Sequence, residues 1–399
     1  MDYLEHIRAL SEENSARILL IVLDGLGGLP LEGKTELESA LKPNLDTLSK
    51  DSALGLADPI APGFTPGSGP AHLSLFGYDP FRYSIGRGIL EALGIDLEVG
   101  GMDIAVRGNY ATLKDGLITD RRAGRISTEE NSRITEFLSQ RINKIEDTEI
   151  ILKPGKEHRF VAIFRGSGLY DNLTDADPQK ENSEPVLTSA LDEHSRKACR
   201  IINTFIEKAR EALYGEPKAN YVLLRGFSRY PDIPRMHDIY RLKPACIATY
   251  PMYRGLARLV GMSILDTGTT LSDEIDTLRE NFSRYDFFFL HIKKTDSYGE
   301  DGNFAEKIKV IESFDRNLPD IIKMGFDVIA ITGDHSTPAL MKSHSWHPNP
   351  LLIHSRFEFR DNLPFDEKNC RKGSLGRISS VSILPLLMAN SSKLKKYGA

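Results

Sequence analysis

Two side chains that can bind a metal ion, Asp334 and His335, follow a short apolar segment in the last fifth of the sequence. Residues 328–331 are rich in β-branched side chains and too few for a helix, which predicts a strand buried on both faces. Within a strand, successive side chains point to opposite faces, so Gly333 must end the strand before the pair can meet one ion. Ligands just beyond the carboxyl end of a parallel strand are typical of open α/β sheets. An ordinary surface turn is the alternative for this segment taken alone.

Two further apolar segments lead into carboxylates in the same way. Residues 17–23 are followed directly by Asp24, and residues 285–292 are followed by Asp296 and Glu300. A separation of four places Asp296 and Glu300 on one side of a helical turn. The glycines after Asp24, at positions 25, 27 and 28, do not follow the dinucleotide-binding spacing G-x-G-x-x-G, so we reject dinucleotide binding. With His344 added, the carboxylates and imidazoles suit two divalent ions such as Mn²⁺, Zn²⁺ or Mg²⁺.

Ser68 lies in a segment built for a bend, because residues 62–70 contain three glycines and three prolines. Residues 71–76 can start a helix, with Pro70 tolerated in its first turn. Free amides and the helix dipole at that end favour a phosphoryl group on the serine oxygen. Metal ions nearby could lower the pKa of the serine and neutralise charge on a transferring phosphoryl group. The alternative is an ordinary serine N-cap.

The middle of the chain, from about residue 81 to residue 241, has a different pattern. We expect strands at 101–106, 108–113, 160–164 and 221–224, and helices at 129–142 and 189–213. Cationic side chains gather at the ends of these segments, and the run Asp-Arg-Arg-x-x-Arg beside a glycine is dense enough to suggest an anion site. Solvated surface arginines are the alternative. The candidates are Arg107, Asp120, Arg121, Arg122, Arg125, His158, Arg159 and Arg225, with Arg254 further along the chain.

Composition limits the classes of protein that remain. At 399 residues the chain has room for about two domains of ~150 residues. A net charge of −5 argues against non-specific nucleic-acid binding. Three well-separated cysteines predict neither a disulfide framework nor a zinc knuckle, as in a reducing cytoplasm. The acidic first 15 residues do not resemble a signal peptide, and no run reaches the ~20 apolar residues of a membrane span. We therefore expect a cytoplasmic protein.

These elements predict an α/β protein with a doubly wound core sheet. The pattern of strand followed by ligand stops near residue 82 and resumes near residue 242, so we expect a discontinuous metal-binding core of 1–82 and 242–399. Residues 83–241 then form an inserted α/β cap that binds substrate. Other expected helices cover residues 4–10, 35–49 with a break at Pro43, 253–260, 303–317 and part of 370–388; further strands cover 243–249 and 351–353.

Several long motifs carry a family resemblance: VLDGLGGLP, PGSGPAHLSLFGYDP, RGNYAT, ITDRRAGRI, CIATYPMYRGLARLVGM, ITGDHSTP and the closing LKKYGA. Through them the sequence resembles, nearly end to end, the archaeal-type cofactor-independent (2,3-bisphosphoglycerate-independent) phosphoglycerate mutases of the alkaline phosphatase superfamily. The resemblance implies an alkaline-phosphatase-like core. It also implies an isomerase that interconverts 3-phosphoglycerate and 2-phosphoglycerate, which are small phosphorylated three-carbon acids, in glycolysis and gluconeogenesis.

The resemblance also implies roles for individual residues. Ser68 would be the nucleophile that carries the phosphoryl group. One metal ion would be bound by Asp24, Ser68, Asp334 and His335, and the other by Asp296, Glu300 and His344. Among the candidates for holding phosphate and carboxylate, Arg121 and Arg122 are the expected bidentate pair.

The sequence departs from the family pattern at three places. Glu300 stands where the family usually has histidine, which predicts an altered metal preference. Gly69-Pro70 replaces Asp-Thr after the nucleophile, and 346–348 read Trp-His-Pro instead of Gly-Asp-Pro. Two alternative functions follow: a phosphatase or phosphotransferase that uses the same serine and metals, and a non-catalytic, metal-stabilised homologue. The sequence makes no prediction of oligomeric state.

Overall fold

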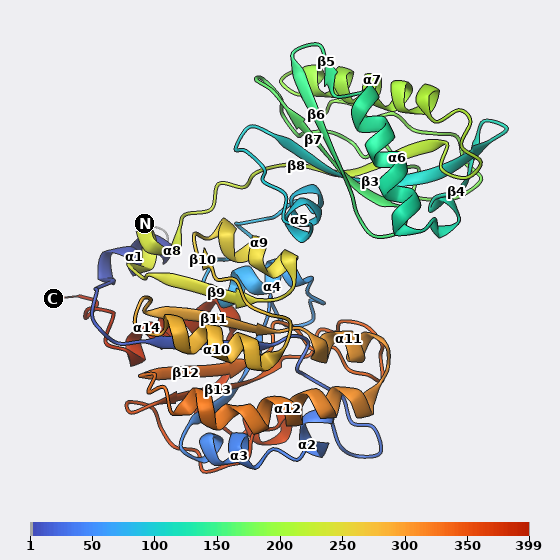
Figure 1. Cartoon of the computed structure of the whole chain (residues 1–399). Coiled ribbons are helices and arrows are strands. Elements are labelled where there is room, and N and C mark those ends of the chain that lie inside the picture. Colours follow the sequence, from blue (N-terminus) through green and yellow to red (C-terminus); the bar gives the residue numbers. More distant parts are fainter. Residues whose placement is uncertain (1–2, 399) are drawn as a thin grey trace. The chain divides into compact units, whose positions relative to one another are not determined.

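A computed structural model describes residues 3–398, and it contains two compact units (Figure 1). The first unit combines the chain up to Ser84 with the chain from Ile233 onward, and the second is the continuous segment Ile85–Asp232. Helix α8 (Met236–Tyr240) packs against α1 (Tyr3–Leu10), which places it in the first unit. None of the described helices is long and apolar enough to cross a membrane. That the second unit acts as a substrate-binding cap stays a prediction.

An eight-stranded sheet forms the centre of the first unit, in the order β10-β9-β11-β1-β12-β13-β2-β14. The strands β10 (Ser263–Ile264), β9 (Pro244–Ala248), β11 (Phe287–Ile292), β1 (Ile18–Leu23) and β12 (Val328–Thr332) are mutually parallel. Strand β13 (Asn349–Ser355) runs antiparallel to β12 and to β2 (Ala53–Asp58), and β14 (Gly376–Ser379) pairs parallel with β2. Every residue of β1, β11 and β12 is buried, which explains their unbroken apolar sequences.

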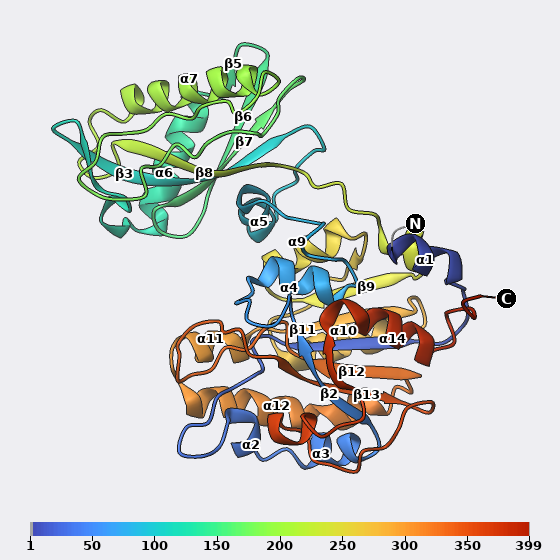
Figure 2. The same ribbon diagram turned by 180° about the vertical axis from the view of Figure 1, so that it is seen from behind.

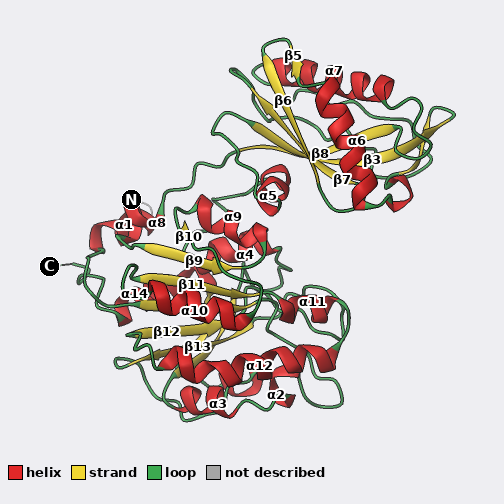
Figure 3. Ribbon diagram, in the orientation of Figure 1, coloured by secondary structure: helices red, strands yellow, loops and turns green. Residues whose placement is uncertain are grey.

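Helices cover both faces of this sheet, so the predicted α/β class with a doubly wound core is confirmed (Figures 2 and 3). One face carries α2 (Glu36–Ser39), α3 (Pro43–Lys50), α10 (Leu271–Asn281) and α12 (Phe304–Ile322). The other carries α4 (Ser68–Leu75), α9 (Pro251–Leu259) and α14 (Ile383–Asn390). Pro43 starts α3, as expected from its fixed φ angle. Helix α11 (Lys294–Glu300) follows β11, and α13 (Glu367–Cys370) packs near β2.

The second unit is built on a mainly antiparallel sheet, β4-β3-β7-β6-β5, with β8 paired to β3. The strands are β3 (Ile104–Lys114), β4 (Leu117–Asp120), β5 (Lys144–Ile145), β6 (Thr148–Pro154), β7 (Arg159–Arg165) and β8 (Tyr221–Arg229). Helices α6 (Thr128–Arg141) and α7 (Arg196–Ala212) share one hydrophobic core with the sheet, while α5 (Arg87–Gly94) packs on β3 and β8.

Two predicted elements of this unit were wrong in extent. The expected strands 101–106 and 108–113 are parts of the single strand β3, because Gly108 lies flat against the ring of Phe160 and does not interrupt the pairing. The helix expected at 189–213 begins only at Arg196. Before it, the Asp192 carboxylate accepts a hydrogen bond from the Ser195 amide at 2.8 Å, a local bond that competes with helix formation.

Candidate functional site

The candidate ligands of the first unit converge because their strands are neighbours. Strands β11, β1 and β12 lie side by side and parallel, so Asp24, the α11 residue Asp296 and the pair Asp334–His335 all emerge at the same edge of the sheet. All four side chains are buried. The turn at Gly333 brings Asp334 and His335 together as predicted, since the His335 Nε2 atom lies 3.1 Å from Asp334 Oδ2.

Asp24, Asp334 and His335 form a first group of potential metal ligands, with one donor atom of each within 4.8 Å of the others. His335 Nε2 is 3.4 Å from Asp24 Oδ1. Among the described residues, Asp24 Oδ1 and Asp334 Oδ2 are buried and have no hydrogen-bond partner. Burial and the Asp24 carboxylate raise the pKa of Asp334 well above its ordinary value. Two adjacent buried carboxylates ionise together only beside a cation, so this donor set fits a divalent metal ion.

A second group consists of Asp296, His335 and His344. His344 Nε2 lies 3.6 Å from Asp296 Oδ1 and 3.7 Å from Glu300 Oε1. Helix α11 places Asp296 and Glu300 on one side, although the Glu300 side chain is 55% exposed. Burial and the Asp296 carboxylate raise the pKa of Glu300. Two carboxylates and an imidazole make a second donor set that fits a divalent cation.

Ser68 is positioned at the first residue of α4, next to the first group. Gly67 is the N-cap of that helix and the serine side chain makes no capping hydrogen bond, so the N-cap interpretation of Ser68 is wrong. The Ser68 Oγ atom instead lies 3.5 Å from His335 Nε2. The preceding loop is tied to the second group, because the carbonyl of Pro66 lies 2.9 Å from His344 Nδ1.

Sequence reasoning missed four residues that touch this centre. Tyr253 donates its hydroxyl proton to Asp24 Oδ2 at 2.6 Å, and Lys293 Nζ lies 3.0 Å from that oxygen and 2.5 Å from Asp296 Oδ2. His72 Nδ1 is 3.4 Å from Asp334 Oδ2, and His291 Nε2 is 3.5 Å from Asp24 Oδ2. A histidine inside the otherwise apolar strand β11 was a usable signal, since buried polar residues need partners. Tyr253 and Lys293 carried no such signal.

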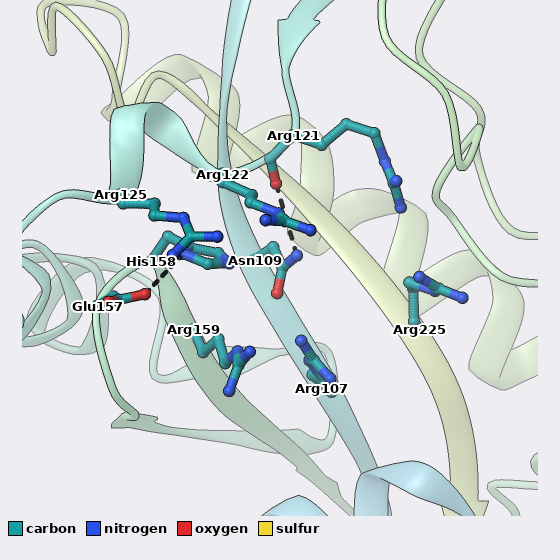
Figure 4. A pocket seen from close by; sticks show the side chains of 9 residues that line it. All are labelled: Arg107, Asn109, Arg121, Arg122, Arg125, Glu157, His158, Arg159 and Arg225. Carbon is teal, nitrogen blue, oxygen red and sulfur yellow. Dashed lines mark hydrogen bonds and ion pairs between the residues drawn. The ribbon is translucent and has the colours of Figure 1, made fainter. Parts of the chain in front are cut away.

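The second unit contains an arginine-lined pocket of about 340 Å³ (Figure 4). Its lining residues are Arg107, Asn109, Arg121, Arg122, Arg125, Glu157, His158, Arg159 and Arg225. Arg107 pairs with Glu91 at 3.1 Å, whereas, within residues 3–398, Arg122, Arg125 and Arg159 have no ion-pair partner. Such a concentration of weakly compensated guanidinium groups is suited to a phosphate or a carboxylate.

Three of the predicted substrate-binding residues have other contacts. Arg121 lines the pocket, but its Nε and Nη2 atoms donate to the two oxygens of the buried Asp177 at 3.0 and 2.6 Å. Asp120 does not line the pocket; its carboxylate accepts the amides of Arg122 and Gly124, both at 2.7 Å, and so holds the turn that presents Arg122 and Arg125. Arg254 belongs to α9 of the first unit, where it pairs with Asp266 at 3.2 Å.

His158 is the titratable imidazole of the pocket lining. Burial, with the charge of Arg159 beside it, lowers the pKa of His158 to about 4. Its Nδ1 atom is buried without a hydrogen-bond partner among the described residues. A neutral imidazole between arginines can therefore accept or donate a hydrogen bond without adding to the positive charge.

Comparison with known proteins identifies relatives that span the whole chain. Residues 49–219 match the family described as 2,3-bisphosphoglycerate-independent phosphoglycerate mutase. A probable 2,3-bisphosphoglycerate-independent phosphoglycerate mutase from Thermotoga petrophila is 55% identical over 399 residues, covering 100% of both chains.

Two solved structures share the fold. A protein from Pyrococcus horikoshii matches with a TM-score of 0.81 and 33% identity, covering 97% of this chain and 100% of the other. The cofactor-independent phosphoglycerate mutase from Thermoplasma acidophilum matches with a TM-score of 0.77 and 32% identity, covering 94% and 100%. These matches confirm the predicted α/β fold class as that of a cofactor-independent phosphoglycerate mutase. The chain thus belongs to the 2,3-bisphosphoglycerate-independent phosphoglycerate mutases, a family of isomerases.

Proposed function

We propose that this mutase interconverts 3-phosphoglycerate and 2-phosphoglycerate through a phosphoserine formed on Ser68, beside two divalent metal ions. The observation that carries the proposal is the position of Ser68. It is the first residue of α4 and not its N-cap, and its Oγ atom lies 3.5 Å from His335 Nε2, next to buried carboxylate oxygens that have no hydrogen-bond partner among residues 3–398.

The residues divide into three tasks. Asp24, Asp334 and His335, with Ser68, would hold one ion, and Asp296, Glu300 and His344 would hold the other. Bound ions would lower the pKa of the serine and neutralise charge on the transferring phosphoryl group. Lys293, which contacts both Asp24 and Asp296, is placed to steady the carboxylates from the opposite side.

The phosphoryl group passes from the substrate oxygen to Ser68 Oγ, and the serine proton leaves with the solvent or a neighbouring base. Glycerate then turns without leaving, and its other hydroxyl takes the phosphoryl group back from the serine. Retaining glycerate requires charge-matched holders and exclusion of water. We assign that task to the arginine pocket, with Arg122, Arg125 and Arg159 as the guanidinium groups that have no ion-pair partner in the described part of the chain. A role in glycolysis and gluconeogenesis in the cytoplasm belongs to this proposal.

Replacement of Ser68 tests the covalent mechanism directly. Ser68→Ala should abolish mutase turnover, followed with coupled enolase, and any phosphate release, because it deletes the acceptor oxygen. Ser74→Ala is a matched control, since Ser74 lies in the same helix and donates to the Pro70 carbonyl at 3.2 Å. Mass spectrometry after brief exposure to substrate should find phosphoserine at residue 68 of the parent protein.

Two results would reject the mechanism. Substantial turnover by Ser68→Ala would mean that water or another residue attacks the substrate. Phosphate release without mutase turnover in the parent would favour the phosphatase alternative, which uses the same serine and metals with water as the final acceptor.

A further inference from the structure

Thr337 occupies the point where the segments that carry the candidate metal ligands meet. Its side chain is fully buried, two residues after His335. Its amide donates to the carbonyls of Gly25 and Gly27, at 3.2 and 3.1 Å, in the loop that follows Asp24. Its own carbonyl accepts a hydrogen bond from the buried Lys307 Nζ at 2.9 Å. The loops that follow β1 and β12 and helix α12 are therefore joined through the backbone of one threonine.

Two glycines let the neighbouring backbone approach Thr337 closely. A Cβ atom added at Gly25 would lie 2.6 Å from Thr337 Oγ1, and one added at Gly299 would lie 2.3 Å from the Thr337 carbonyl oxygen. Gly25 also has a φ of +63°, which disfavours any side chain. Any side chain at Gly25, in the loop after β1, or at Gly299, in helix α11, would therefore collide with Thr337.

The hydroxyl of Thr337 contacts one residue of each candidate metal group. Its Oγ1 atom lies 2.7 Å from Asp296 Oδ1 and 2.9 Å from His335 Nδ1. Lys293 donates to Asp296 Oδ2, and the threonine hydroxyl donates to Asp296 Oδ1. A hydroxyl has one proton, and the contact to Asp296 uses it. The contact to His335 must then run the other way, with Nδ1–H as the donor and the threonine oxygen as the acceptor.

This hydrogen-bond direction fixes the tautomer of His335. With the proton on Nδ1, the Nε2 atom presents its lone pair to the side of the ring that faces Asp24, Asp334 and Ser68. A histidine that binds a metal is generally held in this way, by a hydrogen bond from its other nitrogen. Here the partner of that bond is not a carboxylate but a hydroxyl that itself holds a ligand of the second group.

We infer that Thr337 is a positioning residue that fixes the tautomer of His335 and couples the two candidate metal sites through one hydroxyl. The inference rests on the proposed function for the presence of two ions. A cation on His335 Nε2 makes Nδ1–H a stronger donor, which polarises the threonine hydroxyl and tightens its bond to Asp296. Occupation of the first site thereby orders a ligand of the second.

Spectroscopy of the imidazole tests the tautomer without any assay of turnover. In protein selectively labelled with ¹⁵N-histidine and loaded with Zn²⁺, we expect His335 to show a protonated Nδ1 and a metal-bound Nε2. Thr337→Val removes the hydroxyl while keeping the branched shape, and it should lose this Nδ1–H signature. Thr337→Ser should retain it. A parent protein in which His335 carries its proton on Nε2 would overturn the inference.

Metal binding tests the coupling. Thr337→Val should weaken Mn²⁺ binding by about 10–100-fold, the usual effect of losing the hydrogen-bond partner of a metal ligand, and Thr337→Ser should restore it to within about threefold. Thr135→Val is a matched control in the second unit, because Thr135 is also buried and bonds two side chains, Tyr110 and Asn131, at 2.8 Å. This control should leave Mn²⁺ binding unchanged.

A double-mutant cycle separates coupling from a simple loss of structure. Asp296→Asn should lower the affinity of the first site in the parent but less in Thr337→Val, because the connecting hydroxyl is already absent and only the contact through Lys293 remains. Equal, additive losses would show that Thr337 supports each site independently and would overturn the coupling. These measurements also stand apart from the mutase mechanism: if Ser68→Ala remained active while the tautomer and coupling were as expected, only the proposed function would fail.

Discussion

The candidate metal-ligand cluster (Asp24, Asp296, Asp334 and His335) and the arginine pocket each gather charges of one sign. The repulsion between those charges is offset differently in the two regions. In the first unit, Asp24, Asp296 and Asp334 are buried, and Lys293, Tyr253 and surrounding histidines are packed around them. In the second unit, the arginines line an open pocket whose only acidic lining residue within the described chain is Glu157. Burial magnifies electrostatic interactions. We therefore expect the buried carboxylates to be selective for one kind of cation and the arginine pocket to accept several anions.

The two regions also differ in where their parts come from. The cluster draws residues from segments up to about 310 positions apart in sequence, joined by the parallel pairing of β1 with β11 and β12. The pocket is made by β3, β7, β8 and the turn after β4, all inside one continuous unit. A disturbance in the first region should therefore reach the whole core, and one in the second should remain local.

Removal of metal should give the largest difference in response between the two regions. With chelator, we expect complete loss of mutase turnover and a loss of core stability of about 4 kcal/mol, if the ion had been present at ~1,000 times its Kd. The second unit should keep its stability. Native-state hydrogen exchange of β1 and of β7 reads the two units separately. Equal loss of hydrogen-exchange protection in both strands would contradict the expected difference between the two units.

Arg122 and Arg121 should give different phenotypes despite being neighbours. Arg122→Ala should lower mutase turnover by about 100-fold, since it removes one charged hydrogen bond of ~2–3 kcal/mol, while hydrolysis of a simple phosphate ester falls much less. Arg121→Ala should instead destabilise the second unit by about 3 kcal/mol, because it removes the bidentate partner of the buried Asp177 and leaves only the longer Arg225 contact, at 3.6 Å, as an ion pair.

Arg133→Ala is the control for both variants, since Arg133 is an exposed arginine of the same unit that pairs with Glu216. It should change neither turnover nor stability appreciably. If Arg121→Ala lost turnover selectively and kept its stability, Arg121 would be a substrate holder and the pairing with Asp177 would be incidental.

Replacement of Glu300 tests whether its exposed side chain contributes to the metal affinity of the second candidate site. Glu300→Ala should lower the affinity of the second metal site by about tenfold or more, and Glu300→His should retain binding with a shift of preference towards Zn²⁺. Asp301→Ala changes the adjacent exposed carboxylate and serves as the control. Calorimetric titration with Mn²⁺ and Zn²⁺ measures both effects; an unchanged isotherm for Glu300→Ala would make Glu300 a solvated side chain.

The smallest expected effect, per pH unit, is a change in stability with pH that has opposite sign in the two units. Burial raises the pKa of Glu274 to about 8, so its contribution to core stability is fully present below its unfolded pKa and is lost as pH rises through 8. Burial lowers the pKa of His158 to about 4, so the second unit gains stability as pH rises from about 4 to 6.5.

Each slope is at most about 1.4 kcal/mol per pH unit. Glu274→Gln should flatten the dependence in the core, and His158→Gln should flatten it in the second unit. Hydrogen exchange between pH 5 and pH 8 measures both. Slopes of the same sign in the two units would contradict these assignments.

Sequence reasoning succeeded where a signal was continuous along the chain. The strands β1, β11 and β12 were predicted because burial on both faces demands unbroken apolar residues, and their ligands followed at the strand ends. Strand β2 was missed although it is fully buried, because Ala53, Gly55 and Ala57 make it only weakly apolar. The antiparallel direction of β13 depends on tertiary pairing and left no trace in its own residues.

The candidate site shows the same limit. Asp24, Asp296, Asp334 and His335 could be grouped because a parallel sheet brings strand ends together. The contact of Tyr253 with Asp24 spans 229 positions, and the pairing of Arg121 with Asp177 spans 56. Neither partner is marked by spacing or by composition. Such residues are found only when packing is known.

The position of β1 has a consequence for the order in which the chain folds. Its six buried residues find their partners only in β11 and β12, so about 270 further residues must be made before the centre of the core sheet can close. The segment Ile85–Asp232 has its own core and no such delay, and we expect it to fold first during synthesis. Until then Ile18–Leu23 is an exposed, uncharged strand without proline, the kind of segment that aggregates. Charged residues before it, Glu12, Glu13 and Arg17, are the features of the chain that counter this hazard.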